Sequence, residues 1–381
     1  MKKTNPIGLL MLLLMLPQFV ETIYSPVLPS VQQHFHIKEE SVALTISLYF
    51  IAFALGVAFW GIQCDRIGRK KSLEYGLMTY AIGSLIAIFA PNFIILLISR
   101  ILSAFGIAVG SIVTQTILRD TYDQTQIAKV FSWIGIGLSI SPVIGMITGS
   151  IFASSIGYWG VFCIVFILAV LFLILSKLKI SETHHTGRKI DFKSLAHLSK
   201  RMLSDVEIIK SCLLIMGFNV MLFSYYSLAP FIFRQNGFTS YEFGYSSIIL
   251  AAGTFTGAHI NRFLLQKNIS SSTLVRLGVY ISFTASIFIW IAGERMLFLI
   301  PFCFIVMAFG ISIPNILSTV LIRYNNEKGS AGAVLGLIYY TLIGVGLVAV
   351  GFIQQLGISC LIFSGIGMFV ILTMKRNEAA L

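Results

Sequence analysis

The chain has 381 residues, of which 57% are hydrophobic and only 11% are charged. Soluble domains carry roughly 25% charged residues, so this composition excludes an ordinary water-soluble fold. The formal net charge of +12 fits loops of a membrane protein better than a nucleic-acid surface. The five cysteines lie far apart and mostly in apolar runs, which excludes a disulfide framework and a metal-binding cluster.

Apolar runs recur between short polar breaks along the whole chain, and each is close to the length of about 20 residues that crosses a bilayer. They predict an all-α membrane protein with twelve spans, at roughly 7–29, 42–63, 73–90, 93–117, 128–152, 158–177, 209–233, 243–262, 273–292, 296–320, 330–353 and 357–374. The first run follows Lys2 and Lys3 but lacks a small-x-small cleavage site. We therefore interpret it as an uncleaved helix and not as a signal peptide.

The longest polar stretch divides the predicted spans six and six. The expected units are an N-terminal bundle at 1–176, a linker at 177–208 and a C-terminal bundle at 209–381. The halves also share a pattern, because Gly61-x-x-x-Asp65-Arg66 is repeated 196 residues later as Gly257-x-x-x-Asn261-Arg262. Such an echo indicates an internal duplication, which is frequent in transporters.

The loop between the second and third spans, residues 61–70, reads G-I-Q-C-D-R-I-G-R-K. A basic loop with a glycine turn accounts for its cations but not for Asp65 at a helix end. The loop resembles the signature of the major facilitator superfamily, G-x-x-x-D-R-x-G-R-K, at every fixed position.

The resemblance implies the major facilitator fold, in which two six-helix bundles enclose a central cavity and transport by alternating access. It also implies that Asp65 latches the bundles near the start of the eleventh span, at Gly329 to Gly332, where a helix N-terminus favours a carboxylate. The implied gating residues are Gly61, Asp65, Arg66, Gly68, Arg69, Lys70, Arg119 and Asp120.

The fourth span carries Arg100, followed by Ser103, Ser111 and Thr114 at helical spacing. An unpaired cation at this depth costs several kcal/mol, so we expect Arg100 to face the bundle interior beside a partner. The three hydroxyl residues form one polar face and are candidates for the substrate cavity. The segment from Leu97 to Ser111 is also similar to a second signature of the superfamily, an arginine followed by small residues.

Glu21 is the one acidic residue that we place deep inside a span. With Gln18, Thr22 and Ser25 it forms a polar stripe at i, i+3, i+4 and i+7, and the stripe is assigned to the substrate cavity. Burial favours the neutral carboxyl group and a nearby cation favours the charged one, so Glu21 and Arg100 together are the candidate proton-coupling site. The alternative is a permanent, purely structural ion pair between them.

The fifth span contains small residues every four positions, which allow close helix packing. The set predicted to form this packing motif is Gly137, Ser141, Pro142, Gly145 and Gly149. It resembles the antiporter signature G-x-x-x-G-P-x-x-G-G, from which Ser141 and Met146 depart. Most aromatic residues in spans pack or anchor the helix, and from the many present we assign Tyr225 and Tyr339 to the cavity.

Over its whole length the chain resembles drug-resistance transporters of the Bcr/CflA type, although their usual acidic position corresponds to Thr22, one residue after Glu21. The resemblance implies a proton-coupled antiporter of the inner membrane that exports hydrophobic or cationic small molecules. A dedicated exporter of a siderophore or metabolite, and a proton-coupled importer, remain alternatives. The expected partners are substrate, protons and the bilayer, with no nucleic acid. We expect a monomer without enzymatic activity, metal or cofactor, driven by the proton gradient.

Charge predicts the topology, because 23 of the 27 Lys and Arg residues lie on the side of the termini and the linker. Basic loops stay in the cytoplasm, so reporter domains fused to the linker and to the loop around Lys38 should report opposite sides. Identical signals from the two fusions would contradict the twelve-span arrangement.

Overall fold

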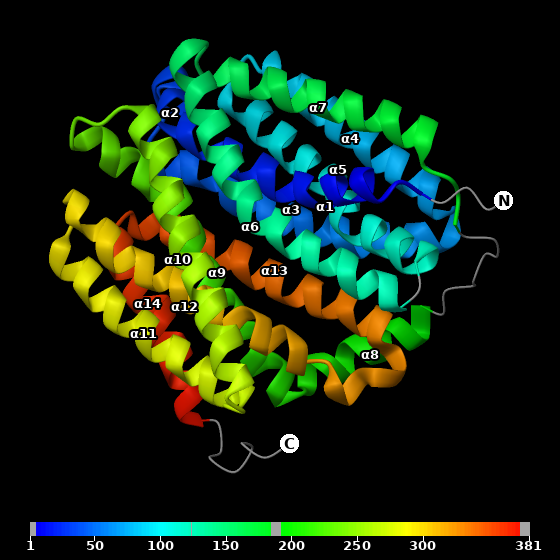
Figure 1. Ribbon diagram of the computed structural model, residues 1–381. Helices are drawn as coiled ribbons and strands as arrows, with labels where there is room; N and C mark the ends of the chain where they lie inside the picture. The colour runs from blue at the N-terminus through cyan, green and yellow to red at the C-terminus, as the bar shows by residue number, and fades with distance from the viewer. Residues whose placement is uncertain (1–4, 123, 184–191, 374–381) are drawn as a thin grey trace.

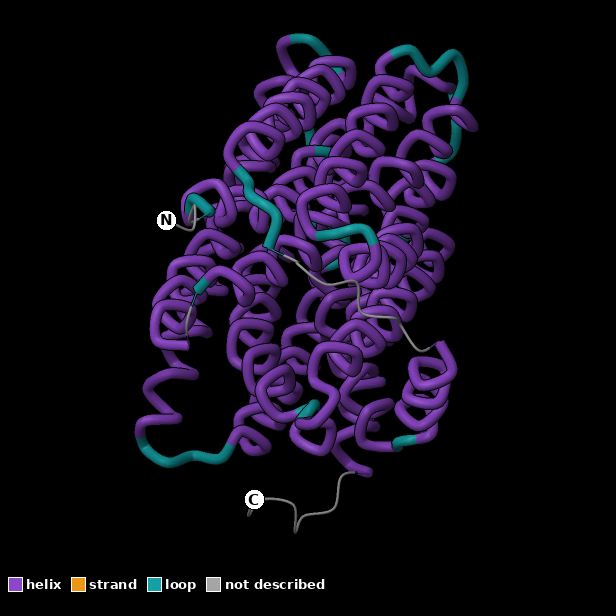
Figure 2. The backbone as a smooth tube through the Cα atoms, turned by 90° about the vertical axis from the view of Figure 1, so that its right-hand side faces the viewer, coloured by secondary structure: helices purple, strands orange, loops and turns teal. Residues whose placement is uncertain are grey.

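The computed structural model describes residues 5–122, 124–183 and 192–373. Within these ranges the chain forms helices joined by short loops, without a strand (Figure 2). The first half contains α1 (Ile7–Ile23), the 3₁₀ turn η1 (Ser25–Val27), α2 (Leu28–Phe35), α3 (Glu39–Arg66), α4 (Arg69–Ile88), α5 (Phe93–Thr121), α6 (Gln124–Ser155) and α7 (Tyr158–Lys179). The second half contains α8 (Phe192–Ser204), α9 (Val206–Gln235), α10 (Ser240–Gln266), α11 (Ser271–Ala292), η2 (Met296–Phe298), α12 (Leu299–Thr319), η3 (Ile322–Glu327), α13 (Lys328–Ile353) and α14 (Leu356–Thr373).

The helices form two bundles, one from α1–α7 and one from α9–α14, which occupy the upper and lower parts of Figure 1. Equivalent helices pack alike in the two halves, since α3 packs along α5 and α10 packs along α12. The all-α fold class is thus confirmed, and the matching pairs agree with the duplication read from the sequence.

Eleven helical segments of the described chain are long and apolar enough to cross a membrane. The third predicted span, α4, does not meet that criterion because Arg69, Lys70, Lys71 and Glu74 occupy its first turns. It nevertheless packs along α5 and α7. The contact between α4 and α5 is close because Gly106 of α5 has no side chain: a Cβ there would lie 2.5 Å from the backbone nitrogen of Tyr80 of α4.

The first span is not the single helix 7–29 that the hydropathy predicts. It stops at Ile23, turns through η1 and continues as α2 to Phe35. Pro26 lies in this turn, and its missing N–H group interrupts the α-helical ladder. The break therefore places Tyr24 and Ser25 outside regular helix, at the boundary between the two bundles.

The linker contains a helix that its polar composition did not predict. The amphipathic helix α8 buries Leu198 and Met202 in a small cluster with Ile208 of α9 and Leu335 of α13. Because α8 contacts both α9 and α13, the linker is attached to the second bundle. Residues 184–191 lie outside the part of the chain that the structure describes.

The bundles meet through α3 with α13 and through α6 with α10. Their closest approach lies toward the end opposite the N-terminus, where a Cβ at Gly344 of α13 would lie 3.1 Å from the backbone of Ser47 and of Ile51. At the other end a Cβ at Gly336 would lie 3.7 Å from the side chain of Val57. The α3–α13 contact is therefore tighter at the end away from the N-terminus.

Polar contacts reinforce that closed end. The Ser25 hydroxyl group donates a hydrogen bond to the Tyr226 carbonyl oxygen of α9. Farther out, the side-chain amide of Gln33, with its oxygen turned toward α9, accepts from the guanidinium of Arg234. The break in α1 thus contributes directly to the seal between the bundles.

Candidate functional site

Arg100 is the buried cation around which the site is built. Its residue is 4% exposed, and its guanidinium carbon lies 4.1 Å from the ring centre of Tyr24 and 4.5 Å from that of Tyr49. The negative face of an aromatic ring attracts a cation, most strongly where water is excluded. Arg100 on α5 is therefore held by rings from the α1 break and from α3.

Several polar atoms around this cation have no hydrogen-bond partner among the described residues. They are the Nε atom of Arg100, the hydroxyl oxygen of Tyr49 and the Oε1 atom of Glu21. Buried polar atoms are normally paired, so a cluster of unpaired ones in one place indicates a functional site.

Glu21 joins this cluster to the opposite bundle. Its carboxyl group interacts electrostatically with Arg100 and also with Tyr226 of α9 and Tyr340 of α13. The ion pairs recorded for the described side chains do not include one between Glu21 and Arg100. The residues share one site as predicted, but the direct contacts of Arg100 are two tyrosine rings and not the carboxylate.

Aromatic side chains from both bundles meet at the interface, and one of them, Tyr340, interacts electrostatically with Glu21. The ring centres of Phe50 and Phe223 are 4.5 Å apart, and those of Phe53 and Tyr340 are 5.0 Å apart. Each pair joins α3 to a helix of the second bundle. Both bundles thus share these aromatic contacts, and Tyr340 connects them electrostatically to the half-buried Glu21.

Three residues predicted for the cavity lie instead where helices pack against one another within a bundle. Thr22 packs against Gly145 and bonds back to the Gln18 carbonyl oxygen at 3.0 Å. Ser103 packs against Gly83 of α4. Tyr225 is fully buried among aromatic rings of the second bundle, where its hydroxyl group bonds to Ser246.

The other cavity candidates are divided between the interface and the helix packing. Ser25 contacts the second bundle, as described above, and the ring centre of Tyr339 lies 4.4 Å from that of Tyr340 with the rings tilted by 44°. Thr114 is fully buried, whereas Gln18 and Ser111 are half-buried. Tyr24, Tyr49, Tyr226 and Tyr340 belong to the abundant aromatic residues of the sequence, of which only Tyr225 and Tyr339 were assigned to the cavity. The helical spacing of Glu21 to Tyr24 is a signal that could have found the first of them.

The small-residue stripe of α6 packs onto α1 as its pattern predicts. The Ser141 hydroxyl group donates to the Met15 carbonyl oxygen at 2.9 Å, and Gly137 faces the Met15 side chain. Gly149 lies against the Ile23 carbonyl oxygen. Pro142 lies inside the same helix. The stripe positions the helix that carries Glu21.

The loop between α3 and α4 contains a charge network centred on Arg69. Its guanidinium pairs with Asp65 at 2.7 Å and with Asp120 at 3.1 Å, and it donates to the Cys64 carbonyl oxygen at 2.7 Å. Gly68 adopts a φ of 100°, which glycine tolerates. Arg69 thus connects the end of α3 to the end of α5.

The remaining loop residues extend this network or point to solvent. Glu182 accepts from the backbone nitrogens of Arg69 at 2.8 Å and of Lys70 at 3.2 Å, where a helix N-terminus favours a carboxylate. The Lys70 ammonium group donates to the Lys177 carbonyl oxygen at 2.8 Å. Gly61 lies against Ile112, and Arg66 and Arg119 are exposed.

The expected contact between Asp65 and the start of α13 stays a prediction. Gly329 belongs to the stretch 325–329, whose side-chain surroundings lie outside the described residues. The ion pair recorded for Asp65 is with Arg69 of its own bundle.

Comparisons with known proteins agree with this architecture. The family model described as Major Facilitator Superfamily matches residues 10–351. An uncharacterized transporter of Rickettsia bellii is 28% identical over 355 residues, which cover 89% of this chain and 87% of the relative. Multidrug resistance protein MdtL of Shewanella oneidensis is 24% identical, with 95% and 92% covered. The crystal structure of a D-xylose-proton symporter matches with a TM-score of 0.78 at 16% identity, over 97% of this chain and 96% of that one.

The charge network predicts a stability difference between two neighbouring cations. Arg69→Ala removes two ion pairs and a hydrogen bond from a nearly buried side chain, and should reduce stability by about 1–2 kcal/mol because its partners are partly solvated. Lys71→Ala, an exposed position in the same turn, is the matched control. Thermal unfolding of the purified variants measures the difference. Equal unfolding temperatures for the two variants would show that the network does not stabilise the loop.

Proposed function

The chain belongs to the major facilitator superfamily, and from this premise we propose that it is a proton-coupled antiporter that exports hydrophobic or cationic small molecules. The observation that carries the proposal is the position of Glu21. It is an acid with an unpaired buried oxygen atom, and it interacts electrostatically both with Arg100 of its own bundle and with tyrosines of the other bundle.

The position of Glu21 suits proton exchange. Glu21 is half-buried, and one of its carboxyl oxygen atoms is inaccessible and unpaired. Desolvation of that group favours the neutral form, whereas the Arg100 cation favours the charged form. Because tyrosine rings bind Arg100, the carboxyl group is not locked into an ion pair. Changes in water access, as the bundles move, would therefore change its proton occupancy.

The surroundings of Glu21 also suggest the class of substrate. Aromatic faces attract organic cations and also bind apolar rings, and Phe50, Phe53, Phe223 and Tyr340 present such faces from both bundles. A cationic substrate would be favoured by charged Glu21 and released when Glu21 binds a proton. Competition between the substrate and the proton for one carboxylate is a simple basis for antiport.

Alternating access would act on the seal described above. Separation of Ser25 from Tyr226 and of Gln33 from Arg234 would open the end away from the N-terminus. The proposal places the chain in the inner membrane, with both termini in the cytoplasm, so that the sealed end faces outward. The inward proton gradient would then drive export by a single chain.

The direct test uses inside-out membrane vesicles that contain the chain, with ethidium and tetraphenylphosphonium as probe cations. An acidic interior should drive uptake of one or both probes. In Glu21→Gln that uptake should fall to the level of vesicles without the chain, because the amide keeps the shape but does not titrate.

Glu40→Gln, which removes an exposed acid at the start of α3, is the control and should transport like the wild type. Rates are compared per folded molecule. A Glu21→Gln protein with wild-type uptake and an unchanged response to the gradient would contradict the coupling role.

A further inference from the structure

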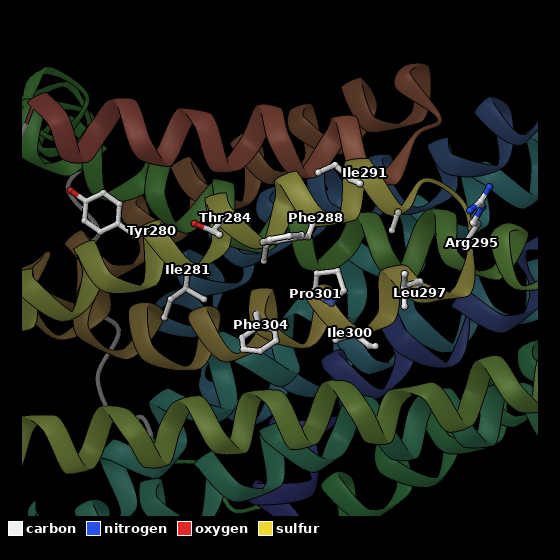
Figure 3. Close-up of a pocket in the computed structure, with 12 residues that line it drawn as sticks. Tyr280, Ile281, Thr284, Phe288, Ile291, Arg295, Leu297, Ile300, Pro301 and Phe304 are labelled. Atoms are coloured by element: carbon white, nitrogen blue, oxygen red, sulfur yellow. The ribbon is translucent and has the colours of Figure 1, made fainter.

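The outer face of the second bundle carries a groove of about 800 Å³ between α11 and α12. The smaller side chains of Thr284, Ala285 and Pro301 line it together with large apolar side chains. In Figure 3, Phe288 and Phe304 lie along the middle of the groove. Its volume is within the range of ligand sites, roughly 300–1,000 Å³. No residue of α1–α7 lines it, so it is separate from the site around Glu21.

The two ends of the groove differ in polarity. Arg295 lies at one end and Tyr280 at the other, as Figure 3 shows. Arg295 follows the end of α11, in the loop before η2, and it is exposed. Among the described residues no ion pair is recorded for Arg295. A cation therefore stands at the water-facing mouth of an otherwise mostly apolar groove.

The groove has the length of one membrane leaflet. Tyr280 and Ile291 are eleven residues apart on α11, which corresponds to about 16 Å along a helix. That is close to half of the hydrocarbon core of about 30 Å. The groove thus runs from the headgroup level near Arg295 to about the bilayer midplane.

We propose that this groove binds one acyl chain of an anionic phospholipid whose phosphate group contacts Arg295. The lipid would belong to the leaflet away from the chain termini. The apolar walls select a hydrocarbon chain, and the cation at headgroup level selects negative charge. The occupied groove would fill the space between α11 and α12, and this inference does not depend on the transported substrate.

The test is native mass spectrometry of the full chain in detergent, titrated with phosphatidylglycerol and with phosphatidylcholine of the same acyl chains. The wild type should bind one phosphatidylglycerol about fivefold more tightly than phosphatidylcholine, the preference expected from one basic residue near the surface. Arg295→Gln should remove that preference. Arg276→Gln, which removes a charge from the same helix outside the groove, should keep it.

A second variant tests the groove itself. Thr284→Trp places a large ring at an exposed position of the groove and should abolish tight binding of both lipids, whereas Leu277→Trp on the same helix outside the groove should not. A fivefold preference that persists in Arg295→Gln, or wild-type binding by Thr284→Trp, would overturn the proposal. Displacement of the lipid by ethidium at equal concentration would assign the groove to cargo, and would overturn it as well.

Discussion

Burial of the Arg100 guanidinium is the constraint on which the arrangement of the first bundle depends. A cation that deep in a bilayer costs several kcal/mol unless the protein surrounds it with favourable groups. Here the compensation comes from the faces of Tyr24 and Tyr49. These contacts hold the α1 break, α3 and α5 together, and the ion pairs recorded for the described residues do not include one for Glu21.

The same constraint connects the site to the seal between the bundles. Tyr24 contacts Arg100, and the next residue, Ser25, bonds to the Tyr226 backbone of α9. Movement of the second bundle away from this turn would alter the packing around Arg100 and Glu21 together. The two bundles and the buried charges are therefore linked through a few residues of broken helix.

Equivalent positions in the two halves of the chain make different polar contacts. Asp65 at the end of α3 pairs with Arg69 at the membrane surface. Its counterpart Asn261 in α10 is buried and accepts a hydrogen bond of 2.6 Å from Asn315 of α12. An ion pair whose carboxylate is partly exposed can exchange partners at a lower cost than a buried amide pair can open. Of the two positions, Asp65 is therefore better suited than Asn261 to a contact that opens and closes.

The sequence predicted the helical class and most of the spans, because long apolar runs are strong local signals. It also predicted that Glu21 and Arg100 interact, which they do electrostatically without a recorded ion pair. It did not predict which groups touch Arg100, since ring faces from α1 and α3 meet it only in the folded bundle. Thr22 and Ser103 were assigned to the cavity by helical spacing, but short hydroxyl side chains also fit where helices approach closely. The break at Ser25 was missed because the apolar run continues through Pro26, the local signal that interrupts the helix. Helix α8 was missed because its few apolar side chains are buried only against α9 and α13.

The most direct test of the account is whether Glu21 binds a proton within the folded chain. Infrared difference spectroscopy of the purified protein in lipid, recorded while pH is changed, detects protonated carboxyl groups without a substrate. The account predicts a protonated carboxyl band that titrates in the wild type and is missing from Glu21→Gln. A band that is identical in the two proteins would contradict it.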